Sequence, residues 1–118
     1  MLIKVLRAKI HRATATEAEL DYIGSITIDS DLLEATGIVP GEVVLVANLN
    51  NGTRHETYVV AGEAGKGRIC VNGAAARLVH PSDKLIIMAH AYVSADEAAA
   101  LVPKIVLVDD NNRPIRML

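Results

Sequence analysis

The sequence predicts a mainly β fold, a small mixed β-barrel with short helices, in a single domain of residues 1–118. Short runs rich in β-branched and aliphatic residues follow one another at close spacing, separated by Asn-Gly, Pro-Gly and other turn signals. Only two or three short segments have helical start and stop signals. This pattern fits a barrel of short strands better than a helical bundle or a doubly wound sheet.

The first strand is expected at residues 2–12, where polar and apolar side chains alternate. One face would carry Val5, Arg7, Lys9 and His11, and the other Leu6, Ala8 and Ile10. Residues 13–22 are polar and small, so a loop or short turn is expected there. Residues 23–28 place β-branched residues around a Gly-Ser pair and predict a second strand.

A short helix and a hairpin are expected next. Residues 29–37 have an acidic start and a glycine stop, as a short helix would. Residues 42–49 and 54–61 are strand-like and flank Asn51-Gly52, which is a strong hairpin signal.

The second half of the chain continues the pattern of short elements. We expect a turn at 62–67, a strand at 68–72, one helical turn at 74–76, a strand at 84–93, a strand at 104–108 and an edge strand at 114–118. Ser94 and Glu97 form a capping-box sequence, which predicts a short alanine-rich helix to about residue 101.

The composition excludes several classes of partner. The core must be aliphatic, because 51% of the residues are hydrophobic while Phe and Trp are absent and only three residues are Tyr. The formal net charge is −2 with both signs mixed along the chain, so we expect no nucleic-acid partner and no membrane partner.

Cysteine and histidine usage argues against a metal site. Cys70 is the only cysteine, so it forms no internal disulfide, and it is interpreted as a small buried hydrophobic residue. The four histidines lie singly on different segments, and no metal is expected. The N-terminus lacks a signal-peptide pattern, which predicts a cytoplasmic protein.

The pair Gly24-Ser25 is the one motif that could carry unusual chemistry. A serine can attack the carbonyl carbon of the preceding residue and form an ester, and glycine relaxes the steric limits on the distorted peptide that this requires. Elimination and hydrolysis would then leave a pyruvoyl group. Alone the pair says little, since about half of chains this size contain one by chance, and on spacing alone a bulge or bend in a barrel strand is the better explanation.

Three sequence blocks together carry a resemblance to a known family. Lys9–Thr14 with Asp21–Ser25 and Ile28-Asp29, then Asn51–Tyr58, then Val71–Ala76 resemble bacterial aspartate 1-decarboxylases in order and spacing, from about residue 3 to residue 108. Asp21, Ala64 and Lys66 depart from the family pattern, outside the matched catalytic positions.

The resemblance implies a six-stranded double-psi β-barrel and a self-processing enzyme. Cleavage between Gly24 and Ser25 would give a β chain of residues 1–24 and an α chain of residues 25–118. The pyruvoyl group formed from Ser25 would bind the amino group of L-aspartate as a Schiff base and accept electrons as the α-carboxylate leaves. The products would be carbon dioxide and β-alanine, which feeds pantothenate and coenzyme A synthesis.

The resemblance also implies roles for individual residues. Tyr58 would be the proton donor, and Lys9, Arg54, Thr57, Gly73, Ala74 and Ala75 would bind substrate. Gly24, Ser25, Thr57, Tyr22 and Asn72 would take part in self-cleavage, and His11 would add positive charge beside the dicarboxylate. Without the family match, Arg54 reads as a surface charge, Tyr58 as a barrel tyrosine and Asn72-Gly73 as a plain turn.

The expected site has one geometric difficulty. Thr57 and Tyr58 are adjacent, and an ideal strand points them to opposite faces. They can serve one site if a bulge intervenes or if the site lies between subunits, as the resemblance to a homotetrameric family implies. The sequence leaves open whether cleavage needs an accessory maturation protein.

Three other functions are compatible with parts of the sequence. A double-psi barrel that only binds ligands has no need of Ser25 together with Arg54, Thr57, Tyr58 and Asn72. A DNA-binding regulator predicts a clustered basic surface, against which the net charge argues. A related decarboxylase for another small amino acid differs only in the substrate, and Arg54 with Lys9 favours aspartate.

Overall fold

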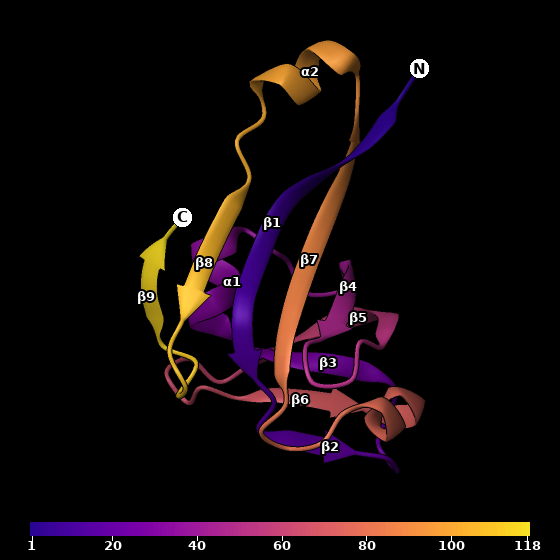
Figure 1. Ribbon diagram of the computed structural model, residues 1–118, viewed down its shortest axis with the longest axis vertical. Coiled ribbons are helices and arrows are strands. Elements are labelled where there is room, and N and C mark those ends of the chain that lie inside the picture. Colours follow the sequence, from indigo (N-terminus) through magenta and orange to yellow (C-terminus); the bar gives the residue numbers. More distant parts are fainter.

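Nine strands in one hydrogen-bonded sheet form the framework of the computed structural model, which describes residues 1–118 (Figure 1). They are β1 (Ile3–Thr14), β2 (Glu17–Glu19), β3 (Ser25–Asp29), β4 (Val43–Asn48), β5 (Arg54–Gly62), β6 (Ile69–Asn72), β7 (Lys84–Val93), β8 (Lys104–Val108) and β9 (Pro114–Met117). Their order is β2-β6-β3-β5-β4-β7-β1-β8-β9. The predicted mainly β fold is confirmed, but this ladder has β2 and β9 at its ends and does not close.

Most of the predicted elements are present. The hairpin of β4 and β5 turns at Asn51-Gly52, and β7 and β8 have the expected bounds. The helices are α1 (Ser30–Thr36), the 3₁₀ helix η1 (Gly73–Leu78) and α2 (Ala95–Ala100), and α2 begins with the predicted capping box. The prediction of a loop over residues 13–22 is wrong in part, because β1 runs on to Thr14 and β2 pairs in parallel with β6.

Two irregularities in β1 decide which side chains face the core. The register against β7 shifts at Arg7 and again at Arg12, whose φ is +66°. A bulge inserts one unpaired residue and reverses the alternation beyond it. Leu6 therefore lies opposite His90 on the outer face, whereas Ala8 lies opposite buried Ala89. For residues 2–12, the prediction of which side chains share a face is therefore wrong for the residues before Arg7 and correct for those after it.

The core is a cluster of 20 buried aliphatic residues contributed by both halves of the sheet and by α1. The isoleucines of β1, β3, β6 and β7 are among its largest members: Ile10, Ile26, Ile28, Ile69 and Ile87. No aromatic side chain is buried, as the composition predicts.

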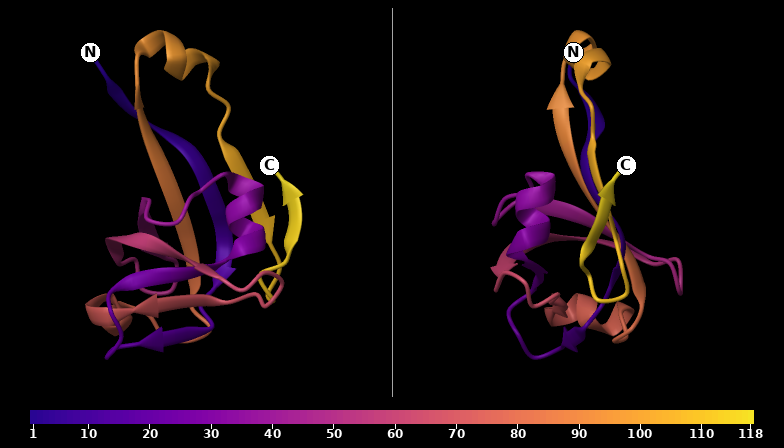
Figure 2. Two further views of the ribbon diagram at one scale, coloured as in Figure 1. Left: turned by 180° about the vertical axis from the view of Figure 1, so that it is seen from behind. Right: turned by 90° about the vertical axis from the view of Figure 1, so that its left-hand side faces the viewer.

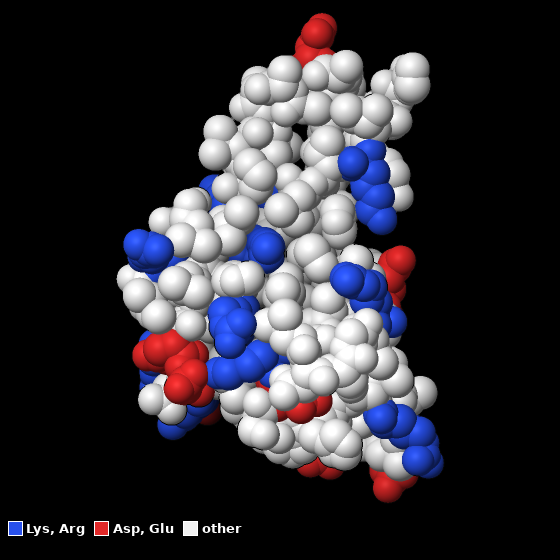
Figure 3. Space-filling model, in the orientation of Figure 1, with Lys and Arg blue, Asp and Glu red and all other residues white.

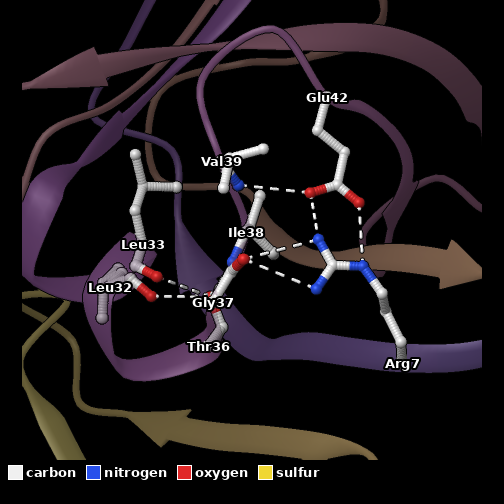
Figure 4. Close-up of polar contacts among 8 residues, drawn as sticks. All are labelled: Arg7, Leu32, Leu33, Thr36, Gly37, Ile38, Val39 and Glu42. Atoms are coloured by element: carbon white, nitrogen blue, oxygen red, sulfur yellow. Dashed lines mark hydrogen bonds and ion pairs between the residues drawn. The ribbon is translucent and has the colours of Figure 1, made fainter.

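Charged groups tie the connecting segments to this core. The Arg7 guanidinium pairs with Glu42, with Nε 3.0 Å from Oε2, and donates to the carbonyl of Gly37 at 3.4 Å (Figure 4). Asp29 accepts hydrogen bonds from the amides of Asp31, Gly65 and Gly67. Burial opposes the charge on Asp29, but these bonds prevail and lower its pKa. The hydrogen bonds from Gly65 and Gly67 therefore hold the turn before β6 against Asp29 at the end of β3.

The outer ends of β1 and β7 project with α2 as an arm (Figures 1 and 2). The arm is mostly uncharged, whereas Lys, Arg, Asp and Glu are interspersed over the rest of the same face (Figure 3). Tyr92 and Val102 on this arm are 68% and 82% exposed. No helix has the length and apolar character needed to cross a membrane.

Candidate active site

The antiparallel pairing of β3 with β6 brings four polar or thiol side chains together. Ser25 lies opposite Asn72, and Thr27 lies opposite Cys70. Residues two apart on a strand point to the same face, so all four side chains lie on one side of this ladder. Each is at most 6% exposed.

Asn72 connects these groups by hydrogen bonds. Its Nδ2 donates to Ser25 Oγ at 3.0 Å and to Thr27 Oγ1 at 3.2 Å, and its Oδ1 accepts from Cys70 Sγ at 3.1 Å. Ser25 Oγ also lies 3.5 Å from the carbonyl oxygen of Ile23, to which it donates. The serine hydroxyl therefore lies beside an amide donor that would stabilise negative charge on its oxygen.

The peptide before Ser25 is far less confined. Residues 21–24 are exposed, and no atom lies within 4 Å of where a β-carbon on Gly24 would be. Gly73 packs against this segment: its own β-carbon would lie 2.6 Å from Gly24 Cα and 3.3 Å from the carbonyl oxygen of Tyr22. Gly73 also has a φ of +76°, so both space and conformation require glycine there.

A cavity of about 570 Å³ opens beside Gly24. We call it the processing cavity, because it borders Gly24, after which the sequence predicts cleavage. Its walls are Gly24, His55, Glu56, Thr57, Asn72, Ala74, Ala75, Arg77 and Leu78. It joins β5, the end of β6 and the start of η1 to the Gly24-Ser25 bond, and it has room for a small polar molecule.

The remaining predicted side chains lie elsewhere. Lys9 and Arg54 line a second hollow of about 310 Å³, which shares no residue with the processing cavity. We call it the cationic groove; its other walls are Ala47, Asn48, Leu49, Gly52, Ile86 and Met88. It lies on the outer face of the sheet, where the pairing places Lys9 beside Met88 and His11 beside Ile86.

The strand β5 separates the two hollows. It pairs with β4 without a register shift from Arg54 to Tyr58, so its side chains alternate regularly. Thr57 is half-buried and lines the processing cavity, whereas Tyr58 is 40% exposed on the face that carries Arg54. Within one protomer, β5 has no bulge that would turn Thr57 and Tyr58 to the same face, and the two residues share no pocket.

Two histidines have buried ring nitrogens without a hydrogen-bond partner, His11 Nδ1 and His55 Nε2. Burial lowers the pKa of His11, and the charges of Lys9 and Arg12 lower it further. Burial alone lowers the pKa of His55. Both imidazoles are therefore held toward the neutral form, one at the end of the outer face and one in the processing cavity.

The structure thus divides the predicted residues into two groups. Gly24, Ser25, Thr57, Asn72, Gly73, Ala74 and Ala75 come together around the processing cavity. Lys9, His11, Arg54 and Tyr58 share the outer face. The Tyr22 side chain is 64% exposed and joins neither group, although its backbone contacts Gly73.

Six residues of this site were not among the predicted ones. Four line the processing cavity, namely His55, Glu56, Arg77 and Leu78, and the other two, Thr27 and Cys70, contact Asn72. For three of them the two-residue period of a strand was a usable signal. His55 precedes Thr57 by two residues, Thr27 follows Ser25 by two, and Cys70 precedes Asn72 by two.

The sequence also matches known proteins over nearly its whole length. The model of the aspartate decarboxylase family matches residues 1–115. Aspartate 1-decarboxylase of Caldicellulosiruptor saccharolyticus is 59% identical over 99% of this chain and 91% of its own length. The enzymes named likewise from Ruminiclostridium cellulolyticum (60%, over 98% of this chain and 91% of the relative) and Bacillus cytotoxicus (58%, over 100% and 93%) are similarly close.

Proposed function

Because this chain belongs to the aspartate decarboxylase family, we propose that it decarboxylates L-aspartate with a pyruvoyl group made by self-cleavage at Ser25. The chain is a decarboxylase, a carbon–carbon lyase that converts L-aspartate to β-alanine and carbon dioxide. In this family β-alanine supplies pantothenate and coenzyme A synthesis. The origin of the reacting group and the roles of single residues form the proposal.

The first step of the proposal is cleavage after Gly24. Ser25 Oγ loses its proton and attacks the Gly24 carbonyl carbon, the C–N bond breaks, and the Ser25 nitrogen takes up a proton, which leaves an ester. Removal of the Ser25 Cα proton then breaks the Cβ–Oγ bond and releases Gly24 as a carboxylate. Addition of water to the remaining dehydroalanine and loss of ammonia give a ketone, with no net oxidation.

The hydrogen bond from Asn72 Nδ2 to Ser25 Oγ is the observation that carries this proposal. It places an amide donor where negative charge forms on the serine oxygen, in a site that is nearly closed to water. The open surroundings of Gly24 allow the segment to leave after cleavage. Thr57, in the wall of the processing cavity, would assist by hydrogen bonding near the scissile carbonyl.

The residues around Ser25 also fit the product group. Ser25 starts a buried strand and is held opposite Asn72, so the new N-terminus of the α chain stays anchored after cleavage. Asn72 and the backbone of Gly73 to Ala75 would hold the group beside the processing cavity. A pyruvoyl carbonyl supplies the electron sink for decarboxylation.

Substrate recognition is assigned to the outer face. Arg54 would bind a substrate carboxylate through two parallel hydrogen bonds, and Lys9 adds a second positive charge in the cationic groove. His11 lies at the end of this group. Tyr58 would hold the proton that replaces carbon dioxide at the substrate Cα.

These two groups meet if each active site lies between two subunits. The outer face offers apolar side chains for assembly beside its charged ones, since Val43 is 56% exposed and Leu45 pairs with Met88. We propose a homotetramer in which the cationic groove of one protomer faces the processing cavity of another. This arrangement also resolves the opposite orientations of Thr57 and Tyr58.

A closed six-stranded double-psi barrel is part of the same proposal. Only Ala15 and Thr16 separate β1 from β2, and both make backbone hydrogen bonds across this corner, to Asp83 and Ile69. Counting β1 and β2 as one bent strand turns the order β2-β6-β3-β5-β4-β7-β1 into a ring, which supports closure.

Two further parts of the proposal are the location of the protein in the cell and its need for a maturation protein. The free, buried thiol of Cys70 fits a reducing compartment and supports a cytoplasmic location. The exposed cleavage segment would also allow an accessory maturation protein to bind it, and incubation of the purified precursor alone tests whether one is needed.

Intact mass of the purified protein tests the proposal. The unaltered chain should give two fragments that break after Gly24, the larger carrying a pyruvoyl terminus, and should form β-alanine from aspartate. Ser25→Ala should remain whole and inactive, because it has no oxygen with which to attack Gly24. Cleavage or β-alanine formation by Ser25→Ala would refute the mechanism, while Ser30→Ala, a nearby serine outside the site, serves as the control.

A further inference from the structure

Asn72 can act on Ser25 only in one orientation of its amide. An asparagine amide can turn by 180° with little change in shape, exchanging its oxygen and its NH₂ group. In the observed orientation the NH₂ group faces the hydroxyls of Ser25 and Thr27. Since a hydroxyl can donate or accept, Thr27 would accommodate either orientation, and Ser25 would do so by giving up its 3.5 Å hydrogen bond to the Ile23 carbonyl.

The group at the other end of the amide discriminates between the two orientations. Cys70 Sγ lies 3.1 Å from Asn72 Oδ1 and donates to it. In the rotated amide the NH₂ group would face the sulfur, which is a weak acceptor. The thiol is free, and Asn72 is its hydrogen-bond partner in a site where Cys70 is 0% exposed.

The thiol has to remain protonated to play this part. Burial raises the pKa of Cys70, and the carboxylate of Glu17 adds to that effect against the opposing charge of Arg68. Arg68 is itself paired with Glu17, with Nε 3.0 Å from Oε1. Cys70 is therefore a thiol near neutral pH and not a nucleophile.

We propose that Cys70 is a positioning residue, whose thiol fixes the amide of Asn72 so that its NH₂ group faces Ser25 Oγ for self-cleavage. This inference rests on the proposed function of Ser25. In the fixed orientation, the amide N–H stabilises the oxygen as it loses its proton. In the rotated one, Asn72 Oδ1 would accept the serine proton and oppose the negative charge.

Substitutions at position 70 separate hydrogen bonding from packing. Cys70→Val keeps an apolar side chain of similar size without a donor, and should slow conversion of precursor to cleaved chains about three- to tenfold, as expected for one lost hydrogen bond. Cys70→Ser restores a donor and should cleave within about twofold of the unaltered rate. The readout is the fraction of cleaved chain by intact mass over time.

A packing control and a spectroscopic signature complete the test. Val71→Ala removes a fully buried neighbour that faces the core, so it should lower thermal stability without slowing cleavage. Because the chain has one thiol, its S–H stretching band in the uncleaved Ser25→Ala protein is unambiguous. This band should shift when Asn72→Ala is added, since the thiol loses its acceptor.

Several results would overturn the inference: an unaltered rate for Cys70→Val, a rate for Cys70→Ser as slow as that for Cys70→Val, equal slowing by Val71→Ala, or an S–H band insensitive to Asn72→Ala. Failure of the proposed function looks different, because Ser25→Ala would then be cleaved. If Ser25→Ala stays whole while Cys70→Val cleaves normally, only the role of Cys70 is refuted.

Discussion

At the scale of single residues, Gly73 packs against the segment in which cleavage is proposed. A β-carbon at this position would lie 2.6 Å from Gly24 Cα, a distance that real contacts do not tolerate. Gly73→Ala should therefore displace residues 22–24 from Ser25 and slow self-cleavage about tenfold or more, the effect of a severe steric conflict. Intact mass over time measures this rate.

Gly41→Ala is the matched control for the backbone. Gly41 has a φ of +88°, similar in sign to that of Gly73, but nothing lies within 4 Å of its β-carbon position. Both substitutions carry the cost of a left-handed conformation, about 1 kcal/mol of unfolding free energy. Equal cleavage rates for the two variants would show that the contact with Gly24 is irrelevant to processing.

The sequence could identify Gly24, Ser25 and Asn72 as candidates but not the group that orients Asn72. Cys70 matched the expectation of a small buried residue, and it is indeed buried. The two-residue period of a strand places Cys70 and Asn72 on one face of β6, but only the register of β3 against β6 sets Ser25 opposite Asn72 and Thr27 opposite Cys70 on that face. Register is a property of paired strands, so no local pattern in residues 68–72 reveals it.

At the scale of elements, β5 separates the two steps of the proposed reaction. Its regular pairing with β4 directs Thr57 to the processing cavity and Tyr58 to the outer face. Thr57→Val should slow self-cleavage at least about tenfold. Tyr58→Phe should leave cleavage unchanged and lower kcat about 100-fold or more, as loss of a general acid does.

Two assays distinguish these outcomes. Intact mass follows cleavage, and β-alanine formation, normalised to the amount of cleaved chain, follows decarboxylation. If Tyr58→Phe blocked cleavage, or if Thr57→Val altered only the second assay, the division of labour along β5 would be wrong. Val60→Ala, on the same face as Tyr58 and farther from Arg54, is a control for the loss of exposed side-chain area on this strand.

Local patterns predicted most elements because their signals are local. The helix α1 begins at an Asp29 cap and ends at Gly37, and the capping box of Ser94 and Glu97 starts α2. The bulge at Arg7 escaped prediction because it arises from the fit of β1 to β7. The short strand β2 also escaped, since its pairing partner β6 is distant in sequence and polar residues dominate the segment.

At the scale of the whole molecule, the sheet order explains why one protomer holds the predicted site residues in two separate groups. The strands β3 and β6 near one end carry Ser25 and Asn72, whereas the groove of Lys9 and Arg54 lies over β1, β7 and the hairpin of β4 and β5. Sequence alone could not assign these residues to separate hollows, because strand order is fixed by long-range pairing. The sequence shows only which chemical groups are available, a serine nucleophile with an asparagine amide and the two cations Lys9 and Arg54.

Mixed oligomers test whether two subunits complete one site. Ser25→Ala lacks the reacting group but keeps the cationic groove, and Arg54→Ala should cleave normally yet lack the carboxylate-binding group, so each alone should be nearly inactive. In oligomers assembled from equal amounts of the two, about one quarter of the sites would combine an intact processing cavity with an intact groove, provided that subunits mix at random. Activity should therefore recover to about one quarter of that of the unaltered enzyme, measured as β-alanine formed per total protein.

Mixing the two proteins after separate assembly, without subunit exchange, is the control and should show no recovery. If co-assembled oligomers also stayed inactive while containing both chains, Ser25 and Arg54 would have to act within one protomer, and the regular alternation of β5 would leave no route for Thr57 and Tyr58 to share a site.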